Sequence, residues 1–225
     1  MQKIFIVIPA YNEKNSISHV VDGLLREGYK DIVVVDDCST DSTARVAEKA
    51  GAVVLRHIIN RGQGAALRTG MDYAIMKGAD IIINFDADGQ HNPKEVKDLV
   101  RPIIKKEADV ALGSRFLKKG SNIPLAKKIV LKLGVLFTFI FSGIWLTDTH
   151  NGFRALSRKA AQMIEIKQDR MEHASEIIDQ IKRKRIKYTE VPVTIMYTPY
   201  SVKKGQSALN SIRIAWRLVW SRFLR

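Results

Sequence analysis

The sequence predicts an α/β fold in which a mainly parallel sheet is covered by helices on both faces. Short apolar runs rich in β-branched residues alternate with helical segments through the first half of the chain. Some of these runs are continuously apolar, which is typical of strands buried on both faces. Polar clusters follow several runs, at the edge where the parallel strands of such folds end and ligands bind.

The order of elements supports this fold class. The first apolar run ends at Pro9, and a helix after the second run has Ser39, Thr40 or Asp41 positioned to cap it. A proline opens the helix that follows the fourth run. The expected strands are 4–8, 31–35, 52–55, 80–85 and 109–112, and the expected helices are 16–26, 41–49, 65–76 and 93–106.

After Gly113 the alternation stops. A long apolar helix, a turn-rich segment over 148–152, a charged helix near 173–185, a β-rich segment over 187–197 and a basic C-terminal helix are expected. The chain shows no internal repeat, low-complexity linker or second core. One domain over residues 1–225 is therefore expected.

Composition restricts the class of protein. The 225 residues carry 37 Lys and Arg against 23 Asp and Glu, a formal charge of +14, which favours an anionic partner such as nucleic acid, a lipid surface or a phosphorylated substrate. The single cysteine, Cys38, and the absence of a signal-peptide pattern indicate a cytoplasmic protein. Lys132 interrupts the most apolar stretch, 129–146, so no transmembrane helix is expected.

Oxygen-bearing side chains follow the fourth expected strand at intervals of two residues. Asn84, Asp86 and Asp88 alternate with other residues, and in extended backbone such side chains share a face. Two carboxylates there can hold Mg²⁺ or Mn²⁺ and leave coordination sites for a diphosphate. A solvated acidic loop is the alternative interpretation of an isolated pair.

Two further strand ends favour the metal-site interpretation. Asp36 and Asp37 end the second strand, and the segment 11–13 follows the first. Turn chemistry explains any one of these clusters, but three clusters at neighbouring strand ends indicate a ligand site.

Four ordered motifs give the sequence a specific resemblance. The chain resembles the family 2 glycosyltransferases, with their GT-A fold, in Pro9-Ala10-Tyr11-Asn12-Glu13, Val35-Asp36-Asp37-Cys38-Ser39, Asp86-Ala87-Asp88-Gly89-Gln90-His91 and Gly113-Ser114-Arg115. Within that family it is most similar to the dolichyl-phosphate and polyprenyl-phosphate sugar synthases, because the segment 148–154 resembles their D-x-x-x-G-F motif. The resemblance covers roughly the first 155 residues.

The resemblance implies roles for individual residues. Pro9, Tyr11 and Glu13 would line the nucleotide pocket, while Asp37 would bond the base and Asp36 would lie near the nucleoside. Asp88 and Gln90 would bind the divalent metal, Mg²⁺ or Mn²⁺, with Asp86 close by. Arg115 would contact phosphate. The half over about 1–115 would thus hold nucleotide sugar and metal, and the half over about 116–225 would serve acceptor and membrane.

The acceptor side departs from the family pattern. The phosphopolyprenol branch carries an Arg-Gly-Glu-Ser-Lys stretch where this chain has Lys204-Gly205-Gln206-Ser207-Ala208, so the final lysine is missing. Lys203 and Lys204 can still meet a phosphate as point charges, together with Arg154 from the motif over 148–154.

The C-terminal segment has the pattern of a membrane-surface helix. Residues 201–225 hold six Lys or Arg and no acid, and Trp216 and Trp220 belong to an apolar face of helical spacing. The alternative is a helix docked on the core. The run 133–146 is either buried core or an interfacial hairpin. A peripheral location at the inner face of the membrane is expected.

The expected activity is transfer of a sugar from a nucleotide-diphosphate donor, a UDP-sugar or GDP-mannose, to a polyprenyl or dolichyl phosphate. An ionised phosphate needs no protein base. Transfer to a sugar or glycolipid hydroxyl is the alternative, and Asp148 is then the candidate base. A nucleotidyltransferase is a remote alternative. Nucleic acid is not an expected partner, because the basic residues accompany an apolar helical face.

Overall fold

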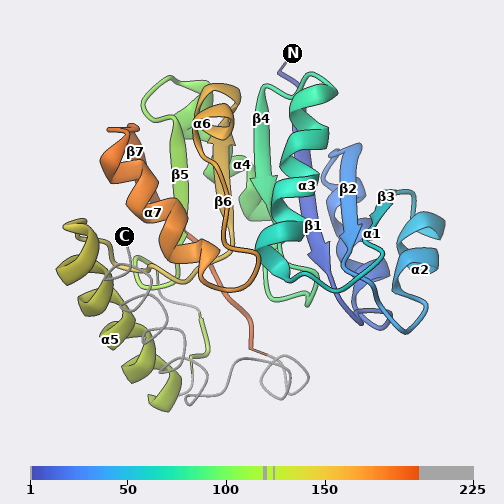
Figure 1. The fold of residues 1–225 in the computed structure, drawn as a ribbon, viewed down its shortest axis with the longest axis horizontal. Helices are drawn as coiled ribbons and strands as arrows, with labels where there is room; N and C mark the ends of the chain where they lie inside the picture. Colours follow the sequence, from blue (N-terminus) through green and yellow to red (C-terminus); the bar gives the residue numbers. More distant parts are fainter. Residues whose placement is uncertain (1, 119–120, 124, 198–225) are drawn as a thin grey trace.

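The structure is a computed structural model that describes residues 2–118, 121–123 and 125–197. Its centre is a seven-stranded sheet with the strand order β3-β2-β1-β4-β6-β5-β7 (Figure 1). Every pairing is parallel except those of β6, which runs antiparallel to both β4 and β5. The strands are β1 (Ile4–Ala10), β2 (Asp31–Asp36), β3 (Val53–Arg56), β4 (Ile81–Asn84), β5 (Val110–Ser114), β6 (Arg154–Ser157) and β7 (Tyr188–Pro192).

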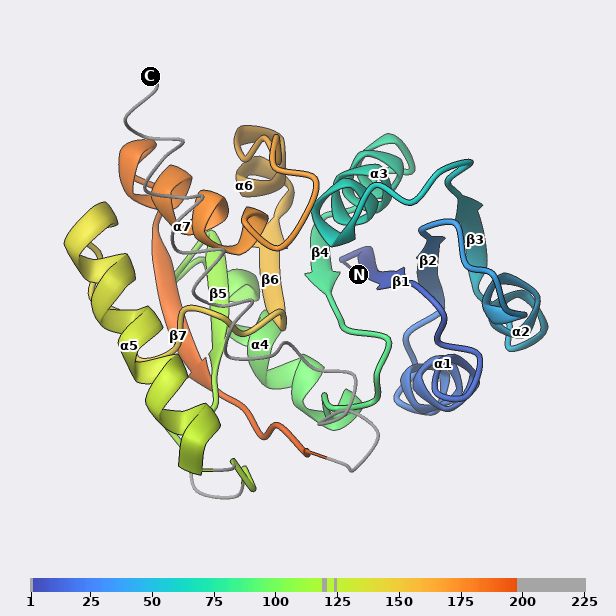
Figure 2. The same cartoon turned by 60° about the horizontal axis from the view of Figure 1, so that its bottom comes forward.

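Helices cover both faces of this sheet, as the sequence predicts (Figure 2). One apolar cluster joins the sheet to α1, α2 and α4, and a second cluster joins its other face to α3, α6 and α7. The described helices are α1 (Ile17–Arg26), α2 (Thr43–Lys49), α3 (Gln63–Met76), η1 (Pro93–Glu95), α4 (Val96–Ile104), α5 (Leu125–Ser142), α6 (Arg158–Met163) and α7 (His173–Arg183).

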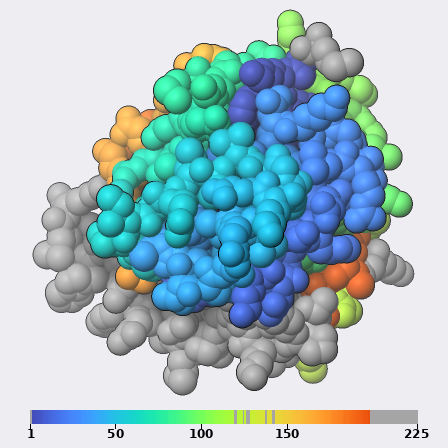
Figure 3. Space-filling view, turned by 90° about the vertical axis from the view of Figure 1, so that its right-hand side faces the viewer, coloured from blue at the N-terminus to red at the C-terminus, as the bar shows by residue number. Residues whose placement is uncertain are grey.

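Alternation along the strands produces the two clusters. Ile6 and Ile8 of β1 belong to the first cluster, and Phe5 and Val7 belong to the second, because successive side chains point to opposite faces. Both sets are at most 4% exposed. Burial on both faces explains why β1 reads as a continuous apolar run. At one end of the sheet, β3, α2 and the segment leading to α3 form the surface shown in Figure 3.

Two elements of the fold differ from the sequence prediction. β6 and α6 fill the region between the turn at 148–152 and the charged helix, where no regular structure was expected. β6 has only four residues, Arg-Ala-Leu-Ser, and none of them is β-branched or aromatic, so its composition carries no strand signal. The strands and helices expected up to residue 112, and the charged helix, are confirmed within about two residues at their ends. The β-rich segment over 187–197 forms a strand only over 188–192, and the expected C-terminal helix lies outside the described residues.

The close approach of α3 to the sheet depends on Gly70. A Cβ atom there would collide with a γ-methyl of Val7 and lie 3.1 Å from Cγ2 of Val35. Both valines are fully buried in strands, so neither can move away readily.

We therefore expect Gly70→Ala to lower the free energy of unfolding by about 1 to 3 kcal/mol, because overpacking outweighs the better helix propensity of alanine. Urea unfolding followed by circular dichroism measures this change. Asp72→Ala, on the exposed side of the same helix, is the control and should change stability by less than about 0.5 kcal/mol. A stabilised Gly70→Ala protein would contradict the packing argument.

Candidate active site

The three polar clusters predicted from the sequence lie on adjacent strands. They follow β2, β1 and β4, which are neighbours in the sheet and run parallel. Asp86 and Asp88 occupy the loop after β4, Tyr11 and Glu13 follow β1, and Asp37 follows β2. The structure therefore gathers these side chains at one edge of the sheet, where the parallel strands end.

Asp86 is held in place by two side chains. Its Oδ2 lies 2.9 Å from Nε2 of His91, and its Oδ1 accepts a hydrogen bond of 3.1 Å from the Gln63 amide. The His91 ring stacks on Phe153, with centroids 4.8 Å apart, and its side chain is only 2% exposed. His91 thus positions a carboxylate, a role that the sequence did not reveal.

Asp88 lies in an electrostatically strained position beside Asp86. Burial and the neighbouring Asp86 carboxylate raise the pKa of Asp88 to about 6. Burial also opposes ionisation of Asp86, but the adjacent His91 lowers its pKa overall. One Oδ atom of Asp88 accepts the Gln90 backbone N–H at 3.0 Å, which turns the loop at Gly89. A cation beside these two carboxylates would relieve their repulsion.

The donor set fits a divalent ion that shares its coordination with a substrate. Among the described residues, no three His, Cys, Asp or Glu side chains converge as a metal site. The loop after β4 offers Asp86, Asp88 and the Gln90 amide oxygen, all of them hard ligands. Mg²⁺ is commonly bound in this way, by one or two carboxylates together with substrate phosphate oxygens.

A buried ion pair joins the end of β5 to the turn before β6. Nε of Arg115, directly after β5, lies 2.5 Å from Oδ2 of Asp148, which also accepts the Arg115 backbone N–H at 3.1 Å. The Arg115 guanidinium donates a second bond, of 2.6 Å, to the Tyr197 hydroxyl. Burial opposes its charge, but Asp148 and Tyr197 raise the pKa of Arg115 overall. Arg115 and Asp148 therefore form one structural unit.

Arg154, at the start of β6, places a second buried positive charge between the two groups. It donates hydrogen bonds to the backbone carbonyls of Asn151 and Thr149. Burial lowers its pKa to about 10, and the carboxylates of Asp86 and Asp148 oppose that shift, so it remains charged at neutral pH. Arg154 lies within the wall of the site and is 3% exposed.

Glu190 of β7 fixes the turn that carries Asp148. Its carboxylate accepts the backbone N–H of Thr147 at 2.9 Å and the Thr147 hydroxyl at 2.7 Å. It also accepts the Asp148 backbone N–H at 3.3 Å. The contact joins residues 43 positions apart, so only the folded structure reveals it.

The expected nucleotide side is formed by two loops that bind each other. Asn12 adopts a left-handed conformation with φ 54°, and its side-chain oxygen accepts the Thr40 backbone N–H at 2.9 Å. The backbone N–H of Glu13 donates to the Thr43 hydroxyl at 2.7 Å. Pro9 and Glu13 are buried, whereas Tyr11 is 44% exposed at the surface of this edge.

Asp37 holds the segment between β3 and α3. One of its oxygens lies 2.7 Å from Nδ1 of His57 and accepts the Arg61 backbone N–H, and the other accepts the Gly62 N–H at 2.6 Å. Nε2 of His57 lies 2.9 Å from the Thr69 hydroxyl. Asp37 thus has an internal positioning function in addition to its expected contact with the base.

Asp36 is buried without a hydrogen-bond partner. Its carboxylate is 1% exposed, and the nearest described cation is the Arg56 guanidinium at 3.5 Å. A buried carboxylate in this condition is costly and is typical of a functional position.

The glycines before α3 pack against protein. A Cβ atom at Gly62 would lie 2.6 Å from the Asp169 carbonyl, and one at Gly64 would collide with the Gln168 carbonyl. Between them, Gln63 reaches Asp86. Lys203, Lys204, Trp216 and Trp220 of the sequence predictions lie outside the described residues.

We expect Asp148→Leu to lower the free energy of unfolding by about 3 to 5 kcal/mol, because it leaves the buried Arg115 guanidinium without its anion. The double variant Arg115→Met with Asp148→Leu should recover much of that loss, since no charge stays unpaired. Urea unfolding of the single and double variants provides the measurement. Strictly additive losses would contradict the coupling of the two side chains.

Known proteins resemble this chain over nearly its whole length. The chain is 43% identical over 225 residues to an uncharacterized protein of Methanocaldococcus jannaschii, covering 98% of this chain and 92% of that protein. It is 34% identical over 238 residues to the UDP-N-acetylglucosamine–dolichyl-phosphate N-acetylglucosaminyltransferase of Methanococcus voltae, covering 96% and 94% of the two chains.

Solved structures agree on the fold. The crystal structure of glucosyl-3-phosphoglycerate synthase from Mycobacterium tuberculosis with Mn²⁺ and UDP-glucose superimposes with a TM-score of 0.75 at 19% identity, covering 97% of this chain and 77% of that chain. The family model described as glycosyl transferase family 2 matches residues 5–164, which include Asp86, Asp88 and Asp148. The chain belongs to glycosyl transferase family 2.

Proposed function

We propose that this protein transfers a sugar from a nucleotide-diphosphate donor to a polyprenyl or dolichyl phosphate at a membrane surface. The observation that supports this proposal most strongly is that the Asp86 and Asp88 carboxylates follow the end of a parallel strand, in the same site as the buried cations Arg115 and Arg154. Such a site offers opposite charges to a cation and a diphosphate together. The named activity of the Methanococcus voltae relative supports a lipid phosphate as acceptor and a UDP-sugar as donor.

A divalent cation, Mg²⁺ or Mn²⁺, belongs to this proposal. Asp88 and Gln90 would hold it with Asp86 close by, and His91 and Gln63 would keep Asp86 oriented. When bound, such an ion supplies electrostatic stabilisation of the departing diphosphate. Arg115 would contribute positive charge from the protein side, in an orientation fixed by Asp148 and Tyr197.

The donor would occupy the edge formed by the first two loops. Pro9, Tyr11 and Glu13 would line the nucleotide, with Asp36 near the nucleoside. Asp37 would face the base while it orders the segment before α3 through His57 and Gly62. In this proposal, residues 1–115 carry the donor half of the domain and residues 116–225 carry the acceptor half.

The environment of Asp148 favours a phosphate acceptor over a hydroxyl acceptor. A general base must be able to take a proton, but Oδ2 of Asp148 lies 2.5 Å from Nε of Arg115, and the group is 3% exposed. An acceptor phosphate is largely ionised at neutral pH and needs no base. Arg154, with Lys203 and Lys204 from the C-terminal segment, would attract that phosphate.

The proposal places the protein at the cytoplasmic, inner face of a membrane, as a peripheral protein whose C-terminal segment binds the anionic surface. The donor, the lipid phosphate and that surface are its proposed partners.

We expect Asp88→Asn to abolish metal-dependent donor binding while the protein stays folded, because the substitution removes a ligand, keeps the size of the side chain and relieves the repulsion from Asp86. Thermal-shift and calorimetric titrations with UDP-sugars and GDP-mannose, with and without Mn²⁺, measure the effect. Asp80→Asn, at the opposite end of β4, is the control. Equal Mn²⁺-dependent affinity in wild type and Asp88→Asn would refute the assignment.

The acceptor is tested by incubating the enzyme with labelled nucleotide sugar and either polyprenyl phosphate or a glycolipid alcohol, followed by lipid extraction. Label should enter the phosphate lipid. Asp148→Asn should reduce the rate less than about tenfold, since asparagine still offers Arg115 an acceptor oxygen, whereas loss of a general base costs about 10² to 10⁴. Label only in the alcohol, abolished by Asp148→Asn, would establish the hydroxyl alternative.

A further inference from the structure

Helix α5 presents an apolar stripe to the outside of the protein. Five side chains, spaced three or four residues apart, form this stripe and are 49 to 75% exposed: Leu125, Ile129, Leu133, Leu136 and Ile140. Phe139 is also exposed. Its ring meets that of Trp145 edge to face, with ring centroids 5.1 Å apart, and Trp145 is 65% exposed just beyond the helix. This spacing places the side chains along one side of a helix.

The other side of α5 is packed against the protein. Leu131, Val135 and Thr138 are buried at helical spacing, so the stripe is a second apolar face on an already docked helix. Large exposed apolar patches of this kind mark interaction sites. None of the helices within residues 2–118, 121–123 and 125–197 has the length and apolarity to cross a bilayer.

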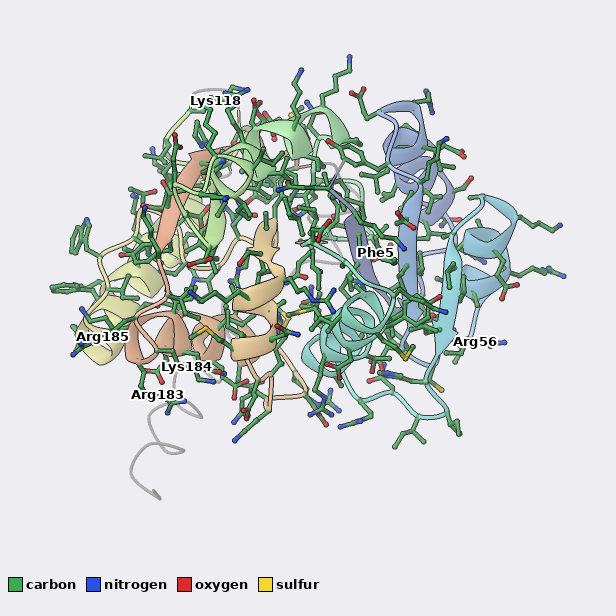
Figure 4. All side chains as sticks on the ribbon, turned by 90° about the horizontal axis from the view of Figure 1, so that it is seen from above. Phe5, Arg56, Lys118, Arg183, Lys184 and Arg185 are labelled. Atoms are coloured by element: carbon green, nitrogen blue, oxygen red, sulfur yellow. The ribbon has the colours of Figure 1, made fainter. Side chains whose placement is uncertain are left out.

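Within the segment that contains the stripe, every charged side chain is basic. Residues 110–147 contain no Asp or Glu, and Lys128 and Lys132 of α5 itself are exposed. No acidic residue occupies the first turn of α5, although acids are favoured at that end of a helix. Arg183, Lys184 and Arg185, at the end of α7, lie on the same flank of the molecule as α5 (Figure 4).

The positive charge of α5 and of the chain as a whole indicates which kind of partner would cover the stripe. A second copy would bring an equally basic surface and a net charge of +14. The chain's own C-terminal segment, 198–225, has six Lys or Arg and no acid, so it would also be repelled. An anionic lipid surface supplies both the hydrocarbon for the stripe and the negative charge for the lysines.

We propose that the outward stripe of α5 is the lipid contact of this protein and lies at the boundary between headgroups and acyl chains of an anionic leaflet. The proposal rests on the proposed function and adds to it a surface distinct from the C-terminal segment.

The position of α5 in the fold links this contact to the active site. The segment 116–147, which contains α5, leaves the sheet after Arg115 and returns at Asp148, and these two residues form the buried ion pair. The first turn of α5 lies toward the edge of the sheet where β1 and β4 end (Figures 1 and 2). A lipid held along α5 would therefore have its phosphate delivered to the charged end of the site.

Trp145 provides a specific reporter. The chain has three tryptophans, so the full-length Trp216→Phe, Trp220→Phe protein fluoresces from Trp145 alone. We expect a blue shift, and quenching by brominated acyl chains, on addition of vesicles of phosphatidylglycerol and phosphatidylcholine in equal parts. Vesicles of phosphatidylcholine alone should give a much smaller response, because they lack the negative charge.

Substitutions on the stripe test the contact itself. Ile129→Gln, Leu133→Gln and Leu136→Gln combined should weaken vesicle partitioning about tenfold or more, since glutamine preserves helix propensity but not apolar insertion. Lys128→Gln with Lys132→Gln should weaken it on the order of tenfold on anionic vesicles only. Met76→Gln with Ile104→Gln, exposed at the ends of α3 and α4, is the matched control and should change nothing.

Transfer to a short-chain, water-soluble prenyl phosphate separates this proposal from the proposed function. Stripe variants should retain that transfer while losing vesicle binding, and circular dichroism checks their fold. If the triple variant unfolds, the single variant Leu133→Gln carries the test. An unshifted Trp145 on anionic vesicles, or undiminished binding by folded stripe variants, would overturn the lipid contact even if transfer persists. Loss of donor-dependent transfer in the wild type would instead overturn the function.

Discussion

The ion pair between Arg115 and Asp148 is the interaction on which the acceptor half of the structure depends. It joins the end of β5 to the turn before β6, and so connects the two ends of the segment 116–147 that contains α5. Because both groups are buried, neither can lose its partner without exposing a charge to a low-dielectric interior. Glu190 holds the same turn through Thr147, so a strand far along the chain also fixes the pair. The orientation of Arg115 is therefore set by the fold before any substrate binds.

Most of the fold could be predicted because strand, helix and turn signals in the first half of the chain all favour the same structure. Buried strands such as β1 and β2 are apolar throughout, the helices between them are amphipathic, and the turn residues lie where the strands end. β6 could not be predicted, because its position between β4 and β5 depends on pairing with two strands that are distant in sequence. Tertiary pairing overrides the weak local preference of Arg-Ala-Leu-Ser.

The candidate site also contains residues that the sequence could identify and residues that it could not. Asp86, Asp88 and Asp37 were identified because carboxylates directly follow strands, a signal that is local in sequence. The partners that orient them, His91, Gln63 and His57, have no such signal: histidine and glutamine in loops are usually surface groups. Their roles depend on distances between segments, which only the folded chain defines. The same holds for Arg115, whose motif indicated a phosphate contact but not its pairing with Asp148.

The site contains both carboxylates and arginines, and this combination restricts what it can bind. Asp86 and Asp88 would repel a free diphosphate. Arg154 and Arg115 belong to the same site, but nearby carboxylates already compensate much of their positive charge. A diphosphate accompanied by a divalent cation would satisfy both sets of groups at once, because Asp86 and Asp88 would attract the cation and the arginines would attract the phosphate. Burial and the neighbouring Asp86 carboxylate, which together raise the pKa of Asp88, both oppose its negative charge. In the proposed function, donor and cation are therefore expected to bind as a unit.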